Sequence, residues 1–322
     1  MVAMNILWLV LGAGVLVLGG ELLVRGSAAL ARALGVSPMI VGLTVVALGT
    51  SAPELIVCVM ASLNKQPDIC AGNVVGSNIL NVLLVLGITA IICPLQASAA
   101  FVRREVPIAL GASLLLWGLS CDGVISRNDA GLLVVLLVAY MAMTVWIARR
   151  EATPVAEGYA ELQATSRKAG TLLNMVLILA GLLLLAWGAD LFLGGAVAIA
   201  KYFKVSEAVI GLTLVAFGTS FPELAACLIA ALRKHPDICL GNLVGSCIYN
   251  IFAIVGVSGL VAPLPIAPDM FRLHIPVMVG AAVLLLVFVT TGYRVSRKEG
   301  AALLMCYAGY VGWSLWIHFQ ST

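Results

Sequence analysis

The chain has 322 residues, of which 62% are hydrophobic and only 10% are charged, and its net charge is +3. Soluble globular chains carry about 25% charged residues, so this composition excludes a water-soluble protein. The few basic residues fall in the loops between apolar segments and give no reason to expect a nucleic-acid partner. No segment has the pattern of a nucleophile with its base or of a nucleotide-binding loop, so we expect neither enzyme activity nor a cofactor.

Ten apolar segments follow one another along the chain. Each has close to, or more than, the roughly 20 residues that a helix needs to cross a hydrocarbon core of about 30 Å. We therefore predict an all-α polytopic membrane protein, with the fourth segment the least distinct. The first segment lacks a basic n-region and is predicted to be a retained helix. The predicted spans are 4–24, 38–63, 69–95, 105–121, 130–148, 172–200, 207–232, 238–264, 273–293 and 300–318.

The basic residues predict the orientation of these spans. With the N-terminus outside, 13 of the 18 lysines and arginines fall in cytoplasmic loops and five in external ones. An excess of positive charge on the cytoplasmic side is the usual arrangement. We therefore expect a multi-pass protein of the cell (plasma or inner) membrane with both termini outside.

One sequence pattern occurs twice, at an offset of 169 residues. GLTVVALGTSAPEL from Gly42 matches GLTLVAFGTSFPEL from Gly211, and PDICAGNVVGSNILN from Pro67 matches PDICLGNLVGSCIYN from Pro236. Over 69 positions aligned without a gap, 34 are identical. The identities include polar and charged residues, so a biased apolar composition does not explain them. Internal repeats of this kind are typical of secondary transporters.

Each half has five predicted spans, an odd number, so the second half enters the membrane upside down relative to the first. We therefore expect ten transmembrane helices arranged as two inverted five-helix repeats, with a binding site near the bilayer midplane. The predicted parts are a first half at 1–148 with its repeat core at 36–87, a cytoplasmic linker at 149–171, and a second half at 172–322 with its core at 205–256.

The motif Gly-Thr-Ser-x-Pro-Glu interrupts an apolar helix in both halves. Pro53 and Pro222 donate no backbone hydrogen bond, so we expect carbonyl oxygens about one turn earlier to be freed from the helix. A freed carbonyl in lipid must find another partner, and a cation is one.

Each motif also carries a carboxylate. Even on a lenient scale, a charge near the bilayer centre costs about 3 kcal/mol, so Glu54 and Glu223 are predicted to be functional. Ser51 and Ser220 lie three residues earlier, on the same helix face. Downstream, a polar stripe with a spacing of four residues occurs in each half. Its members are Asn73, Ser77 and Asn81 in the first half, and Asn242, Ser246 and Asn250 in the second.

Other polar residues have an ordinary structural explanation. Serine and threonine in membrane helices commonly bond to a preceding carbonyl. We expect Asn73 and Asn242, at helix starts, to satisfy loosened backbone groups. Glu21 and Asp190 lie near span ends and are expected to be structural, with Glu21 paired to Arg25 at i+4. The eight cysteines have no Cys-x-x-Cys spacing and are predicted to be packing residues.

The candidate ligands are all oxygen atoms, from carboxylate, hydroxyl, amide and carbonyl groups. Oxygen ligands suit hard cations and disfavour copper or zinc. Calcium takes about six to eight oxygens in a flexible geometry, which the two halves together can supply. The residues alone therefore favour Ca²⁺ and Na⁺ as substrates, while coupling to protons and a cation channel stay open.

The paired motifs Gly-Thr-Ser-x-Pro-Glu and Gly-Asn-x-x-Gly-Ser-x-x-x-Asn resemble the α-repeats of the calcium/cation antiporter superfamily. Within it, the pattern is similar to the sodium/calcium exchanger branch, in its compact prokaryotic form. The resemblance covers essentially the whole chain. It implies a secondary active antiporter that exchanges Na⁺ for Ca²⁺ by alternating access, with the lipid bilayer as its surroundings and no obligatory protein partner.

The resemblance also implies a ligand set drawn equally from both halves. The motif glutamates would be shared carboxylates of the calcium site, and the motif threonines would give backbone oxygens. An alanine and two serines in each half would form sodium sites, and an asparagine from each half would complete the centre. In this chain these residues are Glu54, Glu223, Thr50, Thr219, Ala47, Ser51, Ser77, Ala216, Ser220, Ser246, Asn81 and Asn250.

The chain departs from the family pattern at two positions. Cys247 stands where the first repeat has Asn78, and we expect this to cost a packing or helix contact rather than a ligand. Asn250 stands where potassium-dependent relatives usually carry Asp, which makes potassium dependence less expected. The alternatives that remain are Ca²⁺/H⁺ exchange, K⁺-dependent Na⁺/Ca²⁺ exchange and a cation channel.

Overall fold

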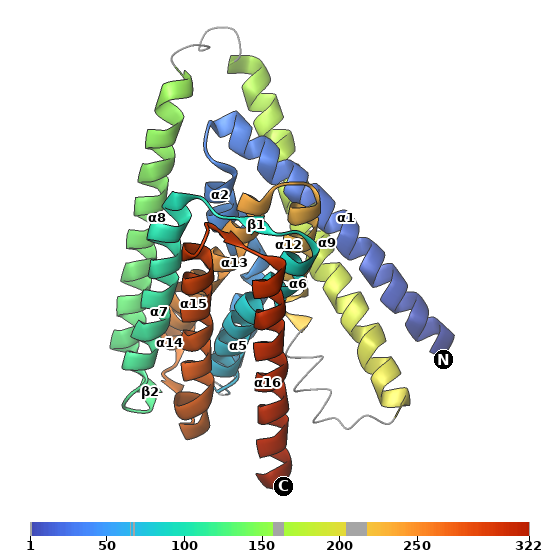
Figure 1. Ribbon diagram of the computed structural model, residues 1–322, viewed down its shortest axis with the longest axis vertical. Helices are drawn as coiled ribbons and strands as arrows, with labels where there is room; N and C mark the ends of the chain where they lie inside the picture. The colour runs from blue at the N-terminus through green and yellow to red at the C-terminus, as the bar shows by residue number, and fades with distance from the viewer. Residues whose placement is uncertain (1, 65, 67, 157–163, 204–217, 322) are drawn as a thin grey trace.

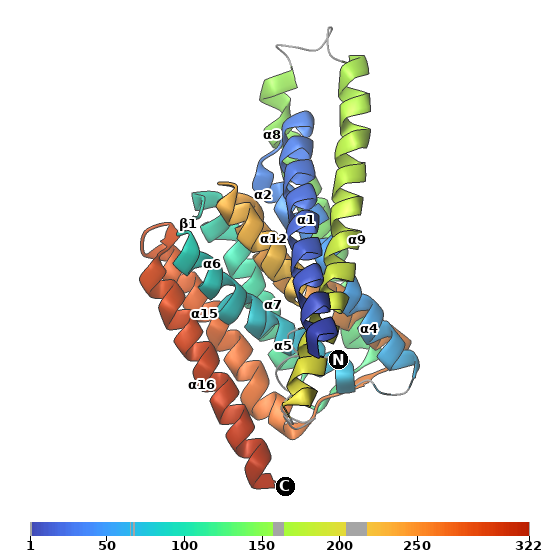
Figure 2. The ribbon, with the colours of Figure 1, turned by 90° about the vertical axis from the view of Figure 1, so that its right-hand side faces the viewer.

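The computed structural model describes residues 2–64, 66, 68–156, 164–203 and 218–321. These residues are almost entirely helical (Figure 1). Two long helices, α1 (Val2–Leu34) and α9 (Ala164–Tyr202), lie side by side across one face of a bundle formed by the remaining helices, as Figure 2 shows from a second direction.

The first half continues from α1 with short helices separated by π-helical turns. In chain order these are α2 (Pro38–Val41), η1 (Gly42–Val46), α3 (Ala47–Thr50), α4 (Ala52–Leu63), α5 (Asp68–Ile79), η2 (Leu80–Val85), α6 (Leu86–Ile92), β1 (Leu95–Gln96), η3 (Phe101–Glu105), α7 (Val106–Leu119), β2 (Val124–Ile125) and α8 (Arg127–Ala156).

The second half repeats this succession after α9, as far as it is described. Its elements are α12 (Phe221–Leu232), α13 (Pro236–Tyr249), η5 (Asn250–Val255), α14 (Gly256–Val261), β3 (Leu264–Pro265), η6 (Met270–His274), α15 (Ile275–Thr290), β4 (Arg294–Val295) and α16 (Arg297–Ser321). The sequence repeat is therefore also a repeat of local structure, down to the π-helical turns and the two-residue strands.

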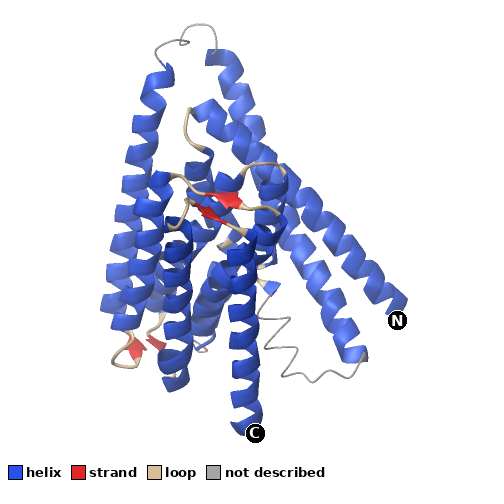
Figure 3. Ribbon diagram, in the orientation of Figure 1, coloured by secondary structure: helices blue, strands red, loops and turns tan. Residues whose placement is uncertain are grey.

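Two small antiparallel sheets join the halves (Figure 3). Strand β1 pairs with β4, and β2 pairs with β3, so each sheet takes one strand from each half. A further bond extends each pairing: the Ala97 N–H donates to the Tyr293 oxygen at 2.7 Å, and the Ile266 N–H donates to the Gly123 oxygen at 2.8 Å. The two sheets are thus counterparts of each other, which indicates that the halves are related by an approximate two-fold operation.

The crossing of α1 and α9 obeys the same relation. A Cβ atom at Gly19 would lie 2.8 Å from the backbone nitrogen of Leu185, and a Cβ at Gly188 would lie 2.8 Å from that of Leu16. Contacts this short require glycine, because any side chain would push the two backbones apart. The long helices therefore touch through their backbones at equivalent positions.

Helix α13 lies at the centre of the bundle. The span from Pro236 to Val261 is buried along its hydrophobic window. A Cβ at Gly241 would meet the Met39 oxygen at 2.7 Å, and a Cβ at Gly42 would meet the Ile238 oxygen at 2.8 Å. This close approach places the helix that leads into the first motif directly against the polar stripe of the second half.

The described residues do not confirm the predicted number of membrane-crossing helices. Among the described residues, six helices are long and apolar enough to cross a membrane, or up to seven if a bent pair counts as one span. The predicted span 38–63 is that bent pair, Pro38–Thr50 and Ala52–Leu63, with a 42° bend. The predicted span 105–121 lies mainly in η3 and α7, which form one continuous helix from Phe101 to Leu119 with Arg103, Arg104 and Glu105 near its start. A bend within one predicted span and charged residues at the start of another thus reduce the number of helices that are long and apolar enough.

Two predicted segments reach beyond the described residues. Only the end of the span predicted at 207–232 is described, as α12. In the segment predicted as a linker, at 149–171, α8 runs on to Ala156 and α9 begins at Ala164. The Arg150 guanidinium stacks over the Trp146 ring, 3.7 Å from its centroid, which supports the extension of α8 past the apolar run.

Candidate ion-binding site

The motif in each half breaks its helix at the serine. Ser51 has φ −85° and ψ 2°, and Ser220 has φ −93° and ψ 4°. This is the bridge region between helix and strand, where residues of functional sites are often found. A new helix begins directly afterwards, with Pro53 or Pro222 in its first turn, where the missing N–H would have no helical partner anyway. The proline therefore stands at a position that favours the start of the new helix.

The break places each carboxylate in the first turn of the new helix. Glu54 lies in the first turn of α4 and Glu223 in the first turn of α12. The positive end of the helix dipole favours a negative charge at this position. The helix break thereby offsets part of the cost of burying the carboxylate.

The carbonyl groups before the break are less free than the sequence predicted. The Ala47 oxygen accepts a hydrogen bond from the Ser51 N–H at 3.0 Å, so it stays within the backbone ladder. A carbonyl oxygen has two lone pairs, and the second remains for another partner. The corresponding Ala216 lies outside the described residues.

The two motifs meet in the interior. Glu54 and Glu223 are each only 1% exposed. They lie close enough for their negative charges to repel each other. The Glu223 carboxyl also lies beside Thr50 and Ser51 of the other half. Residues 169 positions apart in the sequence are thus brought together at one place.

Most of the predicted ligand residues there carry a buried side-chain oxygen with no hydrogen-bond partner among the described residues. Twelve such atoms occur, and eight of them belong to predicted ligand residues. An unpaired buried polar group costs about 1–3 kcal/mol, and such groups are rare in folded proteins. The eight atoms are the Oγ atoms of Ser51, Ser77, Ser220 and Ser246, the Oε2 atoms of Glu54 and Glu223, and the Oδ1 atoms of Asn81 and Asn250. The fold therefore presents buried oxygens suited to a hard cation.

Each asparagine of this set lies where an α-helix becomes a π-helical turn. Asn81 is the second residue of η2, and Asn250 is the first residue of η5. A π-helical turn inserts an extra residue and redirects the side chains around it, and it is common at functional sites. Nothing in the periodicity of the sequence indicates these turns.

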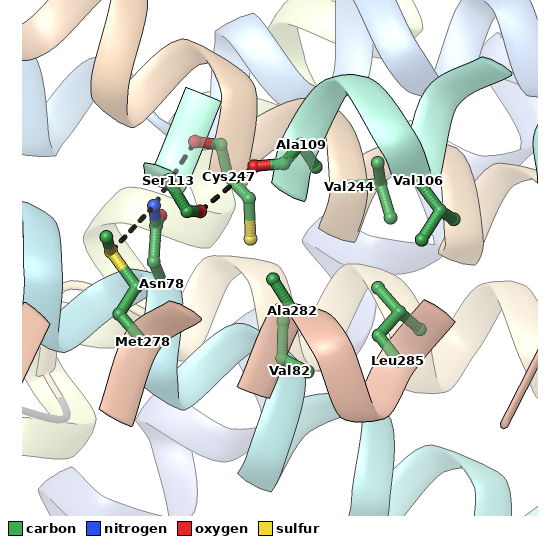
Figure 4. Close-up of a pocket in the computed structure, with 10 residues that line it drawn as sticks. All are labelled: Asn78, Val82, Val106, Ala109, Ser113, Val244, Cys247, Met278, Ala282 and Leu285. Carbon is green, nitrogen blue, oxygen red and sulfur yellow. Dashed lines mark hydrogen bonds between the residues drawn. The ribbon is translucent and has the colours of Figure 1, made fainter. Parts of the chain in front are cut away.

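The amide of Asn250 is held by Asn78. The Asn250 Nδ2 donates to Asn78 Oδ1 at 2.9 Å. Asn78 Nδ2 in turn lies 3.2 Å from the Cys247 backbone oxygen and 3.6 Å from the Met278 sulfur (Figure 4). These bonds use the nitrogen of Asn250 and leave its Oδ1 unpaired. At the repeat position of Asn78 stands Cys247, whose single S–H is a weaker donor, and whose sulfur is a weaker acceptor, than the groups of an amide.

Asn73 and Asn242 do not satisfy backbone groups as predicted, but link the two halves. Thr50 Oγ1 donates to Asn242 Oδ1 at 3.0 Å, and Thr219 Oγ1 donates to Asn73 Oδ1 at 3.5 Å. Each amide nitrogen donates to a thiol 3.4 Å away, that of Cys227 or Cys58. The cysteines therefore have hydrogen-bonding roles that their sequence spacing did not suggest.

The predicted pairing of Glu21 with Arg25 is confirmed, and a second partner joins it. Arg25 bonds one carboxylate oxygen of Glu21, and Arg233 Nε lies 2.7 Å from the other. Arg233 follows α12, so this pair ties α1 to the bundle. Sequence reasoning missed Arg233 because the two residues are 212 positions apart.

With this geometry in place, comparison with known proteins identifies the family. The family model described as "Sodium/calcium exchanger protein" matches residues 4–146 and 173–316. The chain belongs to the sodium/calcium exchanger family. The model matches each half separately, in agreement with the internal repeat.

Relatives of known name match nearly the full length of this exchanger-family chain. The sodium/calcium exchanger MaX1 of Methanosarcina acetivorans is 33% identical over 347 residues, covering 97% of this chain and 98% of its own. The inner membrane protein YrbG of Escherichia coli is 31% identical over 290 residues, covering 89% and 88%. Among solved structures, the sodium-calcium exchanger NCX_Mj soaked with zero Na⁺ and Ca²⁺ matches with a TM-score of 0.83 at 33% identity, covering 97% and 99%.

The unpaired hydroxyls lead to a prediction about stability. Because the Ser246 hydroxyl is buried without a partner, Ser246→Ala should leave the ion-free protein as stable as before, or stabilise it by up to about 2 kcal/mol. Ser120 is the control, because its Oγ donates to the Leu116 oxygen at 2.7 Å. Ser120→Ala should destabilise by about 1 kcal/mol. Thermal unfolding of both variants in detergent, with EDTA and choline in place of Na⁺, measures the difference. A larger loss for Ser246→Ala would mean that its hydroxyl is bonded after all.

Proposed function

We propose that the chain is a secondary active antiporter that exchanges Na⁺ for Ca²⁺ across the membrane by alternating access. The observation that carries this proposal is the set of eight unpaired buried oxygens, two of which belong to carboxylates from different halves. Membership of the sodium/calcium exchanger family supports it. The proposed ligands are those predicted from the sequence, with Ala216 outside the described residues.

The charge of the site explains why the two ions would exchange. Two ionised glutamates carry two negative charges, which one Ca²⁺ or two Na⁺ neutralise. Both kinds of ion need the same carboxylates, so they cannot occupy the site together. An empty site leaves two like charges close together in a medium of low dielectric, which is unfavourable. A penalty for changing conformation while empty couples the two fluxes.

The proposed movement involves α1 and α9. In this proposal the ten helices form two inverted repeats, and α1 and α9 slide across the remaining bundle to open the site to either side. Two observations support the proposal that α1 and α9 slide together as one unit. The two helices touch through glycines at equivalent positions, and they lie together over one face of the bundle (Figure 2). The link from Glu21 to Arg233 would hold α1 in one of its two positions.

The coupling ion is tested in reconstituted vesicles. Vesicles loaded with Na⁺ should take up calcium-45 when diluted into Na⁺-free medium, with no potassium on either side. Asn250 is the reason for potassium independence, because its neutral amide leaves only two carboxylates at the centre. Vesicles with only a K⁺ or a pH gradient are the controls. A potassium requirement would contradict the role given to Asn250, and uptake that follows the pH gradient would make H⁺ the driving ion. Uptake without any opposing gradient would indicate a channel.

The two glutamates should contribute equally. Glu54→Gln and Glu223→Gln each keep the size of the side chain but remove one charge from a buried site, so calcium-45 uptake should fall to background in both variants. Glu21→Gln is the matched control. Its partners Arg25 and Arg233 are 66% and 55% exposed, so their charges stay solvated and exchange should persist. Near-normal uptake by either motif variant at matched protein levels would remove that carboxylate from the site.

The proposed orientation has both termini outside and the linker inside. It rests on the excess of lysine and arginine in the loops that this topology places in the cytoplasm. A reporter fused near Gly158 should therefore be cytoplasmic, and one fused after Thr322 should be external. Alkaline phosphatase and green fluorescent protein fusions at both positions give opposite signals if this holds. The same location for both reporters would contradict two inverted halves of five spans each.

A further inference from the structure

The Thr50 hydroxyl has one proton and several acceptors within reach. Its Oγ1 lies 3.0 Å from Asn242 Oδ1 and 3.4 Å from the Ala47 oxygen. The Glu223 carboxyl lies beside it as well. A hydroxyl donates only one hydrogen bond at a time, so these oxygens compete for the proton. The shorter distance favours Asn242 over the Ala47 oxygen.

The Ala47 oxygen is the less favoured of these two acceptors, and the proposed function gives it a role in ion binding. A threonine in a helix usually bonds a carbonyl one turn earlier, which here is that of Ala47. The Ala47 oxygen already accepts the Ser51 N–H at 3.0 Å, so it has one lone pair left. If the Thr50 proton took that lone pair, the carbonyl could no longer coordinate a cation well.

The orientation of the Asn242 amide is determined by its other neighbour. The Cys227 thiol lies 3.5 Å from the Cys239 backbone oxygen, to which only its S–H can donate. The Cys227 sulfur is then an acceptor for the Asn242 Nδ2, 3.4 Å away. With its nitrogen facing the thiol, the amide must turn its oxygen toward Thr50. The bonds therefore run in one direction, from Thr50 through Asn242 and Cys227 to the backbone.

The same chain of bonds begins at the threonine of the second motif, and two of its three distances are longer. Thr219 Oγ1 lies 3.5 Å from Asn73 Oδ1, Asn73 Nδ2 lies 3.4 Å from the Cys58 sulfur, and that sulfur lies 3.9 Å from the Cys70 oxygen. An arrangement that occurs twice, once in each half, is not an accident of local packing. In both cases the asparagine comes from the half opposite to the threonine.

We propose that Asn242, and Asn73 in the other half, are positioning residues that hold the motif threonine's hydroxyl proton away from the oxygens that coordinate ions. This inference rests on the proposed function. It explains why each polar stripe begins with an asparagine that is not itself among the unpaired groups. It also gives the buried thiols of Cys227 and Cys58 the role of fixing the amide orientation.

The test measures ion binding by the purified protein, independently of transport. Thermal unfolding in detergent is followed as NaCl replaces choline chloride at constant ionic strength, and separately as CaCl₂ is added. A ligand that binds the folded state raises the unfolding midpoint according to its affinity. Asn242→Leu, Thr50→Val and the double variant are compared with the wild type.

Asn242→Leu should weaken Na⁺ binding by about threefold to tenfold, because the Thr50 hydroxyl then donates its proton to an ion ligand. This fold-change corresponds to the net free energy of one hydrogen bond. Adding Thr50→Val removes that proton. The double variant should therefore bind Na⁺ about as tightly as Thr50→Val alone, and more tightly than Asn242→Leu. A residue that matters only for packing would give losses that add. An Asn242→Leu variant with wild-type affinity, or a double variant no better than it, would overturn the proposal.

Two further comparisons keep the test conclusive. If Asn242→Leu does not fold, Asn73→Leu with and without Thr219→Val replaces it, and the same recovery is expected with a smaller effect. Thr44→Val is the control for losing a threonine hydroxyl, because Thr44 Oγ1 donates to the Ile40 oxygen at 2.7 Å, away from the motif. It should change Na⁺ binding less than about twofold. Absence of Na⁺ and Ca²⁺ binding by the wild type would instead refute the proposed function itself.

Discussion

Two carboxylates lie near each other in the interior of a protein in which only 10% of the residues are charged. Glu54 and Glu223 are each only 1% exposed. Burying one such charge is expensive, and burying two of the same sign is more so. The surrounding structure can be understood as a response to this constraint. A helix begins just before each carboxylate, so the dipole favours the charge, and the polar side chains from the opposite half converge on the same place. The remaining unpaired oxygens imply that the protein alone does not complete the compensation.

Backbone contacts make this convergence possible. The helix leading into the first motif crosses α13 so closely that Gly42 and Gly241 have no room for a side chain. With larger residues the two helices would separate, and the Thr50 hydroxyl could not lie 3.0 Å from the Asn242 amide. Helix α13 is accordingly the buried centre of the bundle. Packing, hydrogen bonding and the chemistry of the site thus depend on the same few crossings.

Much of this arrangement could be predicted from the sequence because the repeat provides two independent copies of each signal. The helix break at the motif, the burial of both glutamates and the pairing of Glu21 with Arg25 follow from local spacing. The count of ten spans is not confirmed, because the span with the first motif is a bent pair of helices and the span predicted at 207–232 lies only partly in the described residues. Contacts between distant residues also escaped prediction. Arg233 and the bonds between Thr50 and Asn242 depend on how the helices pack, which no spacing rule contains.

The two small sheets also have a consequence for synthesis. Strand β1 ends at Gln96, whereas its partner β4 begins at Arg294, about 200 residues later. At a synthesis rate of about 5–20 residues per second, β1 waits about 10–40 s for its partner. During that interval its backbone groups must be satisfied by water or by other contacts, because a buried N–H without a partner is unfavourable. The β2–β3 pair closes earlier, since β3 begins at Leu264. The first half therefore acquires its final contacts only when nearly the whole chain has been made.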